Sequence, residues 1–313
     1  FPERSKAERR QLWRAYHRQV MDVAMETIKG FTLPAEQLRE RVVLEGFEPV
    51  LAEIAAGRSL MIVTSHHCNW EWLLLRLTEA LPCPVDAIYK TLQPAGVDEA
   101  FLAMRSRSVA PVLSYGESVG ADVRITDVRL DARGCALFDV VTPSGSASLN
   151  LSIPGRHMAH NAAAAIAVGE ALGVPLSQMV ESLRSATISD RRMQMKTTRN
   201  GALLLDDCYN ANPTSMAAAI ETLAQISATR KVAVLGVMAE IENPEMAYTD
   251  IARLARANNI DIIAVGTDGY GSPAVSIDEV IERIRQCDDS TAVLVKGSRV
   301  AELERVVDAV IPG

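Results

Sequence analysis

The sequence predicts an α/β fold whose C-terminal part, residues 189–313, is an open, doubly wound sheet. Apolar segments of strand length alternate there with segments of helical periodicity. The expected strands are residues 202–206, 231–236, 261–266 and 291–296. The first of them ends in two carboxylates and a polar turn, as parallel strands do at a ligand-binding edge. The chain contains no G-x-G-x-x-G, so a dinucleotide cofactor is not expected.

Length, charge and cysteine content narrow the class of protein. A chain of 313 residues is long enough for two or three domains. The 39 acidic and 32 basic residues give a net charge of −7, which argues against a nucleic-acid partner. Five cysteines without a C-x-x-C spacing predict reduced thiols and no structural zinc. Since the chain shows neither a signal peptide nor an apolar run of about 18 residues, we expect a cytoplasmic protein.

The N-terminal segment predicts one long amphipathic helix ending near Gly30. Trp13, Tyr16, Val20 and Ile28 recur at helical spacing. Basic residues dominate its first half, namely Arg4, Lys6, Arg9, Arg10, Arg14 and Arg18. Such a helix face can contact anionic lipid peripherally at the inner face of the membrane, or it can simply be exposed to solvent. The charge pattern does not separate these two interpretations.

A histidine and a glutamate follow a predicted buried strand at residues 60–64. Residues 35–42 and 47–56 are expected to form two helices before it. His66 follows this strand after Ser65, and Glu71 lies in the first turn of the next predicted helix. Such an imidazole can take a hydroxyl proton while the carboxylate orients the ring. His66-His67-Cys68 could instead suggest a metal, but no second ligand group follows, so no metal is expected.

The string HHCNWEW resembles the lipid A biosynthesis acyltransferases, as do the later Ile88-Tyr89-Lys90, Arg105 and Arg107. The resemblance covers about residues 1–107 and implies an αβ acyltransferase-like fragment over residues 1–109. It implies that His66 is the catalytic base and Glu71 its partner. It also implies that an acyl carrier protein thioester acylates a lipid acceptor without any cofactor.

The middle of the chain predicts an antiparallel meander followed by two helices. Alternating segments at residues 123–130, 135–141 and 147–153 are separated by turns that contain Gly and Pro. Helical patterns follow at residues 161–172 and 176–185. Asn161, at the start of the first helix, is either a binding residue or a helix-capping and packing residue.

The most distinctive string of the chain is DDCYNANPTSM, which starts at Asp206. Asn212 followed by Pro213 is typical of a helix N-cap with proline at the first helical position. A strand end, a polar turn and a helix N-terminus together can present a carboxylate and free amides to a nucleotide and a polar substrate. The alternative interpretation is an ordinary, well-capped αβ loop.

This string resembles the Mur ligases, and among them the members that add D-alanyl-D-alanine to UDP-N-acetylmuramoyl-tripeptide. Its neighbours agree with the resemblance: Gly155-Arg156-His157 with Asn161, then Arg191-Arg192-Met193, and later Val295-Lys296-Gly297-Ser298-Arg299. The family pattern H-N-x-x-N is only partly kept, because Met158 replaces its first asparagine. The resemblance runs from about residue 110 to the end of the chain. It implies the tail of a central ATP-binding domain at 110–188 and a Rossmann-like C-terminal domain at 189–313.

The resemblance to the Mur ligases also implies the roles of individual residues. Asn161 would contact adenine, Arg192 the ATP phosphates and Asp207 the ribose. The incoming dipeptide would be bound by Asn210, Asn212, Lys296 and Arg299. For Lys296 and Arg299 the alternative is that they are ordinary surface cations.

The chain lacks the string that phosphoryl transfer needs in this family. ATP-dependent amide-bond formation with Mg²⁺ requires a phosphate-binding loop of the form G-x-x-G-K-[ST], and none occurs in the sequence. We therefore interpret the chain as a junction, near residues 108–112, of two incomplete envelope-biosynthesis proteins. We expect no ligation from this chain alone. A truncated acyltransferase and a non-catalytic module that binds a nucleotide or a protein are the alternatives.

Overall fold

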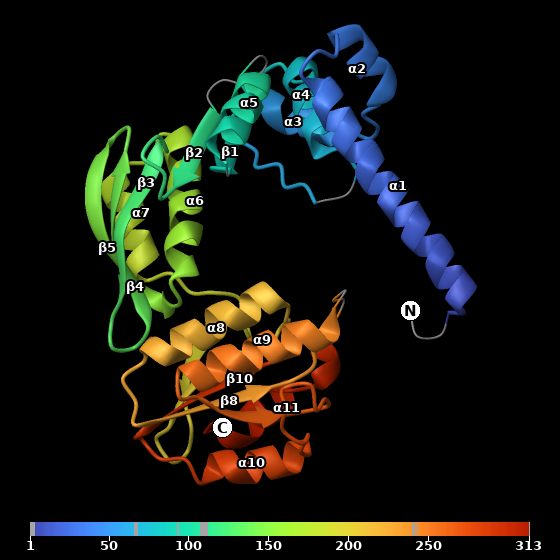
Figure 1. Ribbon diagram of the computed structural model, residues 1–313. Helices are drawn as coiled ribbons and strands as arrows, with labels where there is room; N and C mark the ends of the chain where they lie inside the picture. The colour runs from blue at the N-terminus through green and yellow to red at the C-terminus, as the bar shows by residue number, and fades with distance from the viewer. Residues whose placement is uncertain are drawn as a thin grey trace. The chain divides into compact units, whose positions relative to one another are not determined.

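The computed structural model describes residues 4–65, 68–92, 94–106, 112–239, 241 and 243–312 (Figure 1). The chain divides into two compact units, Phe1–Ser114 (unit 1) and Tyr115–Gly313 (unit 2). None of the helices in the described ranges is both long enough and apolar enough to span a membrane.

Unit 1 is mostly helical; its first four helices agree with the sequence prediction, whereas the helix at residues 95–105 was not predicted. Its elements are α1 (Lys6–Gly30), α2 (Ala35–Arg41), α3 (Glu48–Ala55), α4 (Trp70–Ala80), β1 (Ala87–Lys90) and α5 (Ala95–Arg105). Ser5 caps α1 and forms a capping box with Glu8, which fixes the start of this long helix. A small core of Leu33, Leu38, Trp72 and Leu75 joins α2 to α4.

The buried strand predicted at residues 60–64 is wrong. The segment has no regular secondary structure, and its apolar side chains are open to solvent, with Val63 82% exposed. An apolar run becomes a buried strand only where neighbouring strands and a covering layer bury both of its faces. No described residue of unit 1 pairs with this segment as a strand.

The predicted meander is confirmed. It consists of β3 (Val123–Leu130), β4 (Cys135–Thr142) and β5 (Gly145–Pro154), paired in antiparallel order, and β2 (Val112–Gly116) lies parallel to β3. The strand order of this sheet in unit 2 is β2-β3-β4-β5. The helices α6 (His157–Ala171) and α7 (Leu176–Arg184) pack on it. Because α6 begins four residues earlier than predicted, Asn161 lies inside the helix.

The doubly wound C-terminal sheet is also confirmed. Its strands are β6 (Gln194–Thr197), β7 (Leu203–Asp207), β8 (Arg230–Leu235), β9 (Asp261–Ala264) and β10 (Thr291–Lys296), in the order β6-β7-β10-β8-β9. All are parallel except β6, an antiparallel edge strand that the sequence did not predict. The helices are α8 (Pro213–Gln225), α9 (Pro244–Ala257), α10 (Ile277–Arg285) and α11 (Glu304–Val310), with a short 3₁₀ turn η1 (Arg299–Ala301).

Strand β10 is the centre of this sheet and sets the position of the site. Every residue of β10 is buried, as expected for a parallel strand covered on both faces. Figure 1 shows α8 and α9 on one side of the sheet and α10 and α11 on the other. The register of β10 against β7 pairs Lys296 with Asp207, so both side chains stand at the carboxyl edge.

Candidate active site

A buried ion pair links the carboxyl ends of β7 and β10. Lys296 Nζ lies 2.6 Å from Asp207 Oδ2, and it also donates a hydrogen bond of 3.0 Å to the carbonyl oxygen of Asn210. Lys296 is 2% exposed, so the interpretation of this lysine as a surface cation is wrong. A lysine is buried at such a place only when its charge is paired. Lys296 therefore fixes both Asp207 and the turn that follows it.

Opposing influences act on the Asp207 carboxyl group. Burial raises its pKa, while the ammonium group of Lys296, the hydrogen bond of 3.1 Å from the Met193 amide and the nearby His157 oppose that rise. The carboxyl group has thus lost most of its water, but the neighbouring cation and hydrogen-bond donor stabilise its negative charge. Such a group keeps a fixed orientation and still has lone pairs for a hydroxyl donor.

Two exposed arginines cover the ring of Tyr209, which lies two residues after Asp207. The guanidinium carbon of Arg192 is 4.1 Å from the ring centroid, and that of Arg299 is 5.4 Å from it. Arg192 precedes β6 and Arg299 begins η1, so the fold brings together cations that are far apart in sequence. Both side chains keep donors free of the ring, as the recognition of a phosphate or a carboxylate requires.

The turn after Asp207 is a helix cap. The Asn212 side chain accepts a hydrogen bond of 2.8 Å from the Ser215 amide, and the Ser215 hydroxyl accepts one of 3.1 Å from the Asn212 amide. The Asn210 side chain accepts a hydrogen bond from the Ala211 amide at 2.8 Å. The predicted N-cap at Asn212 is thereby confirmed, and both asparagines lie in the turn that follows Asp207.

The first residue of α6, His157, lies near the buried ion pair, whereas no hydrogen bond or salt bridge among the described residues joins Asn161 to it. Asn161 is exposed, and its Nδ2 lies 3.4 Å from Met158 Sδ. His157 is half-buried and interacts electrostatically with both Asp207 and Lys296. Sequence reasoning missed the part played by His157 and by Tyr209. For Tyr209 a signal existed, namely an aromatic residue inside the polar turn that carries the signature.

The pH dependence of unit 2 should reveal His157. Burial lowers its pKa below the ordinary 6.5; the Asp207 carboxylate opposes this shift, while Lys296 and His160 reinforce it. As the pH falls below about 6.5, the unfolded chain takes up a proton that folded His157 resists, so the free energy of unfolding falls. We expect the urea concentration at the unfolding midpoint to be lower at pH 5.5 than at pH 7.5. This decrease should be larger in the parent chain than in His157→Asn. Equal drops would contradict this account.

In unit 1, Glu71 is buried in the first turn of α4 and forms a two-bond ion pair with Arg105 of α5. The distances are 2.6 Å from Nη2 to Oε1 and 3.1 Å from Nε to Oε2. The Arg105 guanidinium also lies 4.8 Å from the Tyr89 ring centroid and 5.3 Å from that of Phe101. His66, the predicted base, lies outside the described residues. Its pairing with Glu71 remains a prediction.

The described part of the chain contains no group of three or more His, Cys, Asp or Glu side chains arranged to hold a metal ion.

The fold and the site define a class of protein. Residues 191–307 match the Mur ligase glutamate ligase domain, and residues 94–169 match the Mur ligase middle domain. Residues 1–123 match the bacterial lipid A biosynthesis acyltransferase family. Together with the doubly wound sheet, the first two matches support the Mur ligase family for residues 94–307, and the acyltransferase match overlaps them over residues 94–123.

The relatives narrow the resemblance within that class. The UDP-N-acetylmuramoyl-tripeptide–D-alanyl-D-alanine ligase of Escherichia coli K12 is 33% identical over 205 residues, which cover 61% of this chain and 45% of that enzyme. The corresponding ligase of Mycobacterium tuberculosis is 32% identical over 251 residues, covering 68% and 49%. MurF from Acinetobacter baumannii superposes with a TM-score of 0.62 at 29% identity, covering 75% and 53%. The chain therefore spans about half the length of the relatives it matches.

Proposed function

We propose that residues 110–313 form the part of a peptidoglycan-precursor ligase that faces ATP and the incoming D-alanyl-D-alanine. The observation that carries this proposal is the Tyr209 ring, covered by the guanidinium groups of Arg192 and Arg299 beside the buried Asp207–Lys296 pair. Two exposed cations on one aromatic surface suit anionic groups. The phosphates of ATP and the carboxylate of a dipeptide are both anionic.

In this proposal the site has a nucleotide side and a dipeptide side. On the nucleotide side, Arg192 holds the phosphates, Asp207 the ribose and Asn161 the adenine. The dipeptide side consists of Asn210, Asn212, Lys296 and Arg299. ATP bound with Mg²⁺ supplies the phosphoryl group that activates the carboxylate of UDP-muramoyl-tripeptide. The partial central domain is proposed to span residues 110–188, and the C-terminal domain residues 189–313.

The chain alone should bind nucleotide weakly and should not ligate. Its site lacks the amides and lysine of a phosphate-binding loop, and charge-assisted contacts of that kind contribute roughly 1.5–3 kcal/mol each. Losing several of them moves a micromolar affinity to about millimolar, since about 4 kcal/mol is a thousandfold. We expect a millimolar Kd for ADP by NMR titration. We expect no phosphate release above background with Mg-ATP, UDP-muramoyl-tripeptide and D-alanyl-D-alanine.

Matched variants separate this site from unspecific binding. Arg192→Ala should remove the ADP-induced shifts, whereas Arg253→Ala, an exposed arginine in an ion pair on α9, should leave them unchanged. ADP binding without ligation would agree equally with a non-catalytic nucleotide-binding module. Phosphate release that depends on the dipeptide and disappears in Asp207→Ala would overturn the expected inactivity. ADP binding that is insensitive to Arg192→Ala would sink the proposed site.

A second candidate function belongs to unit 1, which we propose is a fragment of a lipid A-type acyltransferase. The observation that favours it is the position of Glu71. This residue lies in the first turn of α4, five residues after His66 in the sequence, and its carboxylate is paired with Arg105 of α5. A carboxylate fixed in this way could orient an imidazole. The exposed apolar residues of α1 include Trp13 (60% exposed) and Tyr16 (59%), and they lie among its basic residues. We propose that this helix contacts anionic lipid as a peripheral element.

Both parts of this candidate can be tested in one assay. Anionic vesicles containing a lipid acceptor are mixed with the chain and an acyl carrier protein thioester. If acyl transfer occurs, His66→Ala should abolish it, because no base remains to take the hydroxyl proton. Trp13→Ala should reduce sedimentation with the vesicles, whereas Trp70→Phe should not. Transfer that survives His66→Ala rules out the dyad, and sedimentation unchanged by Trp13→Ala rules out the lipid contact of α1.

A further inference from the structure

Two residues with left-handed backbone flank Arg192. Arg191 has φ +60° and Met193 has φ +51°, and among the described residues only six non-glycine positions have positive φ. This conformation is unfavourable for residues that carry a Cβ atom, and it persists only where surrounding contacts impose it. Two such residues within three positions mark a bend at residues 190–193, and the arginine proposed to hold phosphate stands inside it.

Main-chain contacts hold both sides of this bend. The Met193 amide donates to Asp207 Oδ1 at 3.1 Å, and the Tyr209 amide donates to the Arg191 carbonyl oxygen at 3.1 Å. Met193 is itself 2% exposed. The bend is therefore tied to the end of β7 and to the residue whose ring Arg192 covers.

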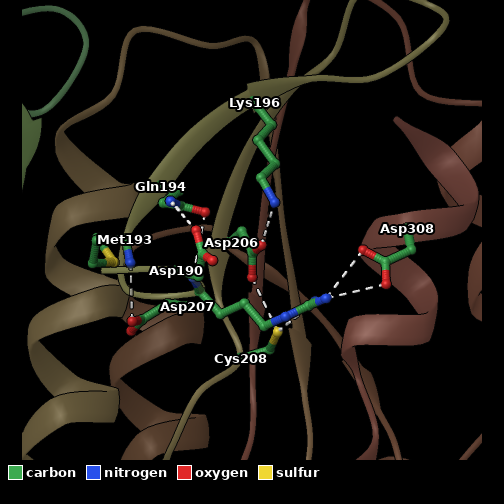
Figure 2. A network of polar contacts seen from close by, with 9 residues as sticks. Asp190, Met193, Gln194, Lys196, Asp206, Asp207, Cys208 and Asp308 are labelled. Carbon is green, nitrogen blue, oxygen red and sulfur yellow. Dashed lines mark hydrogen bonds and ion pairs between the residues drawn. The ribbon is translucent and has the colours of Figure 1, made fainter. Parts of the chain in front are cut away.

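The side chain of Arg191 makes a further connection, to α11. It contacts both Cys208 and Asp308, the two residues labelled at this end of the polar network in Figure 2. Its Nη2 lies 3.1 and 3.3 Å from the two carboxylate oxygens of Asp308, and its Nη1 lies 3.9 Å from Cys208 Sγ. Cys208 in turn donates to Asp206 Oδ1 at 3.0 Å.

Asp206, which accepts the hydrogen bond from Cys208, is held firmly in place. Asp206 is fully buried, and Lys196 Nζ lies 2.6 Å from its other oxygen. Burial and the neighbouring Asp206 raise the pKa of the Cys208 thiol to about 12, so the sulfur stays protonated and acts as a donor to Asp206. Arg191 thus lies between a fixed group in the sheet and a carboxylate on α11.

We infer that Arg191 is a positioning residue. Its guanidinium, held by Asp308, keeps the bend at residues 190–193 in its left-handed form and so aims Arg192 at the Tyr209 ring. The role of Arg192 in phosphate binding rests on the proposed function, but its orientation does not. Asp308 on α11, 117 positions from Arg191 in the sequence, would then control the geometry of the nucleotide side.

Side-chain NMR of the whole chain tests the orientation directly. The ring current of Tyr209 shifts the Nε–Hε resonance of Arg192. The variant Tyr209→Leu gives the chemical shift that this resonance has when the ring is absent. We expect Asp308→Asn and Arg191→Gly each to move this resonance toward that position. The glycine variant is informative because glycine adopts positive φ without cost, so it removes the guanidinium but permits the bend. Asp250→Asn, which breaks a similar exposed pair with Arg253, is the control and should leave the resonance unchanged.

Nucleotide affinity gives an independent measurement. Asp308→Asn and Arg191→Gly should each weaken ADP binding by about three- to tenfold, and the double variant should be no weaker than either single one, because both remove the same clamp. If the resonance stays in place in Asp308→Asn or in Arg191→Gly, the backbone alone sets the bend and the inference is wrong. If the parent chain binds no ADP at all, the proposed function fails, while the resonance still decides the role of Arg191.

Discussion

Lys296→Met should lower the free energy of unfolding of unit 2 by about 3–5 kcal/mol, because it leaves the Asp207 carboxylate buried without its partner. The two side chains are 3% and 13% exposed, so water cannot replace the lost contact. The same change also releases the Asn210 carbonyl oxygen from its donor. The loss should shrink as the pH falls into the acidic range, because burial raises the pKa of Asp207 and protonation removes the unpaired charge.

The experiment benefits from the placement of tryptophan in this chain. Trp13, Trp70 and Trp72 all lie in unit 1, so their fluorescence reports on unit 1, whereas far-UV circular dichroism follows both units. Urea unfolding of Lys296→Met should change the dichroism transition and leave the fluorescence transition in place. Adding Asp207→Asn should recover much of the loss. Arg299→Ala, at an exposed site of the same region, should cost little, and an unchanged dichroism midpoint in Lys296→Met would contradict the prediction.

The sequence predicted the parts of the fold that depend on local pattern. Four of the five strands of the C-terminal sheet were predicted within a few residues, and the cap at Asn212 was predicted from Asn-Pro alone. The order β6-β7-β10-β8-β9 was not predictable, since periodicity does not say which strands are neighbours. Edge strand β6 has only four residues and directly follows the strained bend, so it carries little pattern of its own.

The failures at the candidate sites have the same origin. The run at residues 60–64 has the composition of a buried strand, but burial depends on partners that a local pattern cannot supply. The sequence did not predict that Glu71 pairs with Arg105, 34 positions away, while the predicted pairing of Glu71 with His66 stays a prediction. Lys296 could equally have been a surface cation until the register of β10 placed it against Asp207. In each case the deciding contact is long-range, and the residue type alone permits more than one partner.

Glu71→Gln should destabilise unit 1 by about 3–5 kcal/mol, because it leaves the Arg105 guanidinium buried without a counter-charge. The side chains of Glu71 and Arg105 are 6% and 10% exposed, and Arg105 Nη1 is already buried without a hydrogen-bond partner among the described residues. Glutamine keeps the size of the side chain, so the loss reports the charge and not a cavity. The neighbouring rings of Tyr89 and Phe101 stabilise the cation only partly.

The control for this variant is Glu53→Gln, which breaks the exposed pair between Glu53 and Arg58 and should cost at most about 1 kcal/mol. The fluorescence transition should move to lower urea in Glu71→Gln and stay in place in Glu53→Gln. Replacing Arg105 with methionine as well should restore part of the stability, because neither buried charge then remains. A fluorescence midpoint in Glu71→Gln equal to that of the parent chain would mean that water reaches Arg105. The pair could then not hold Glu71 rigidly enough to orient an imidazole.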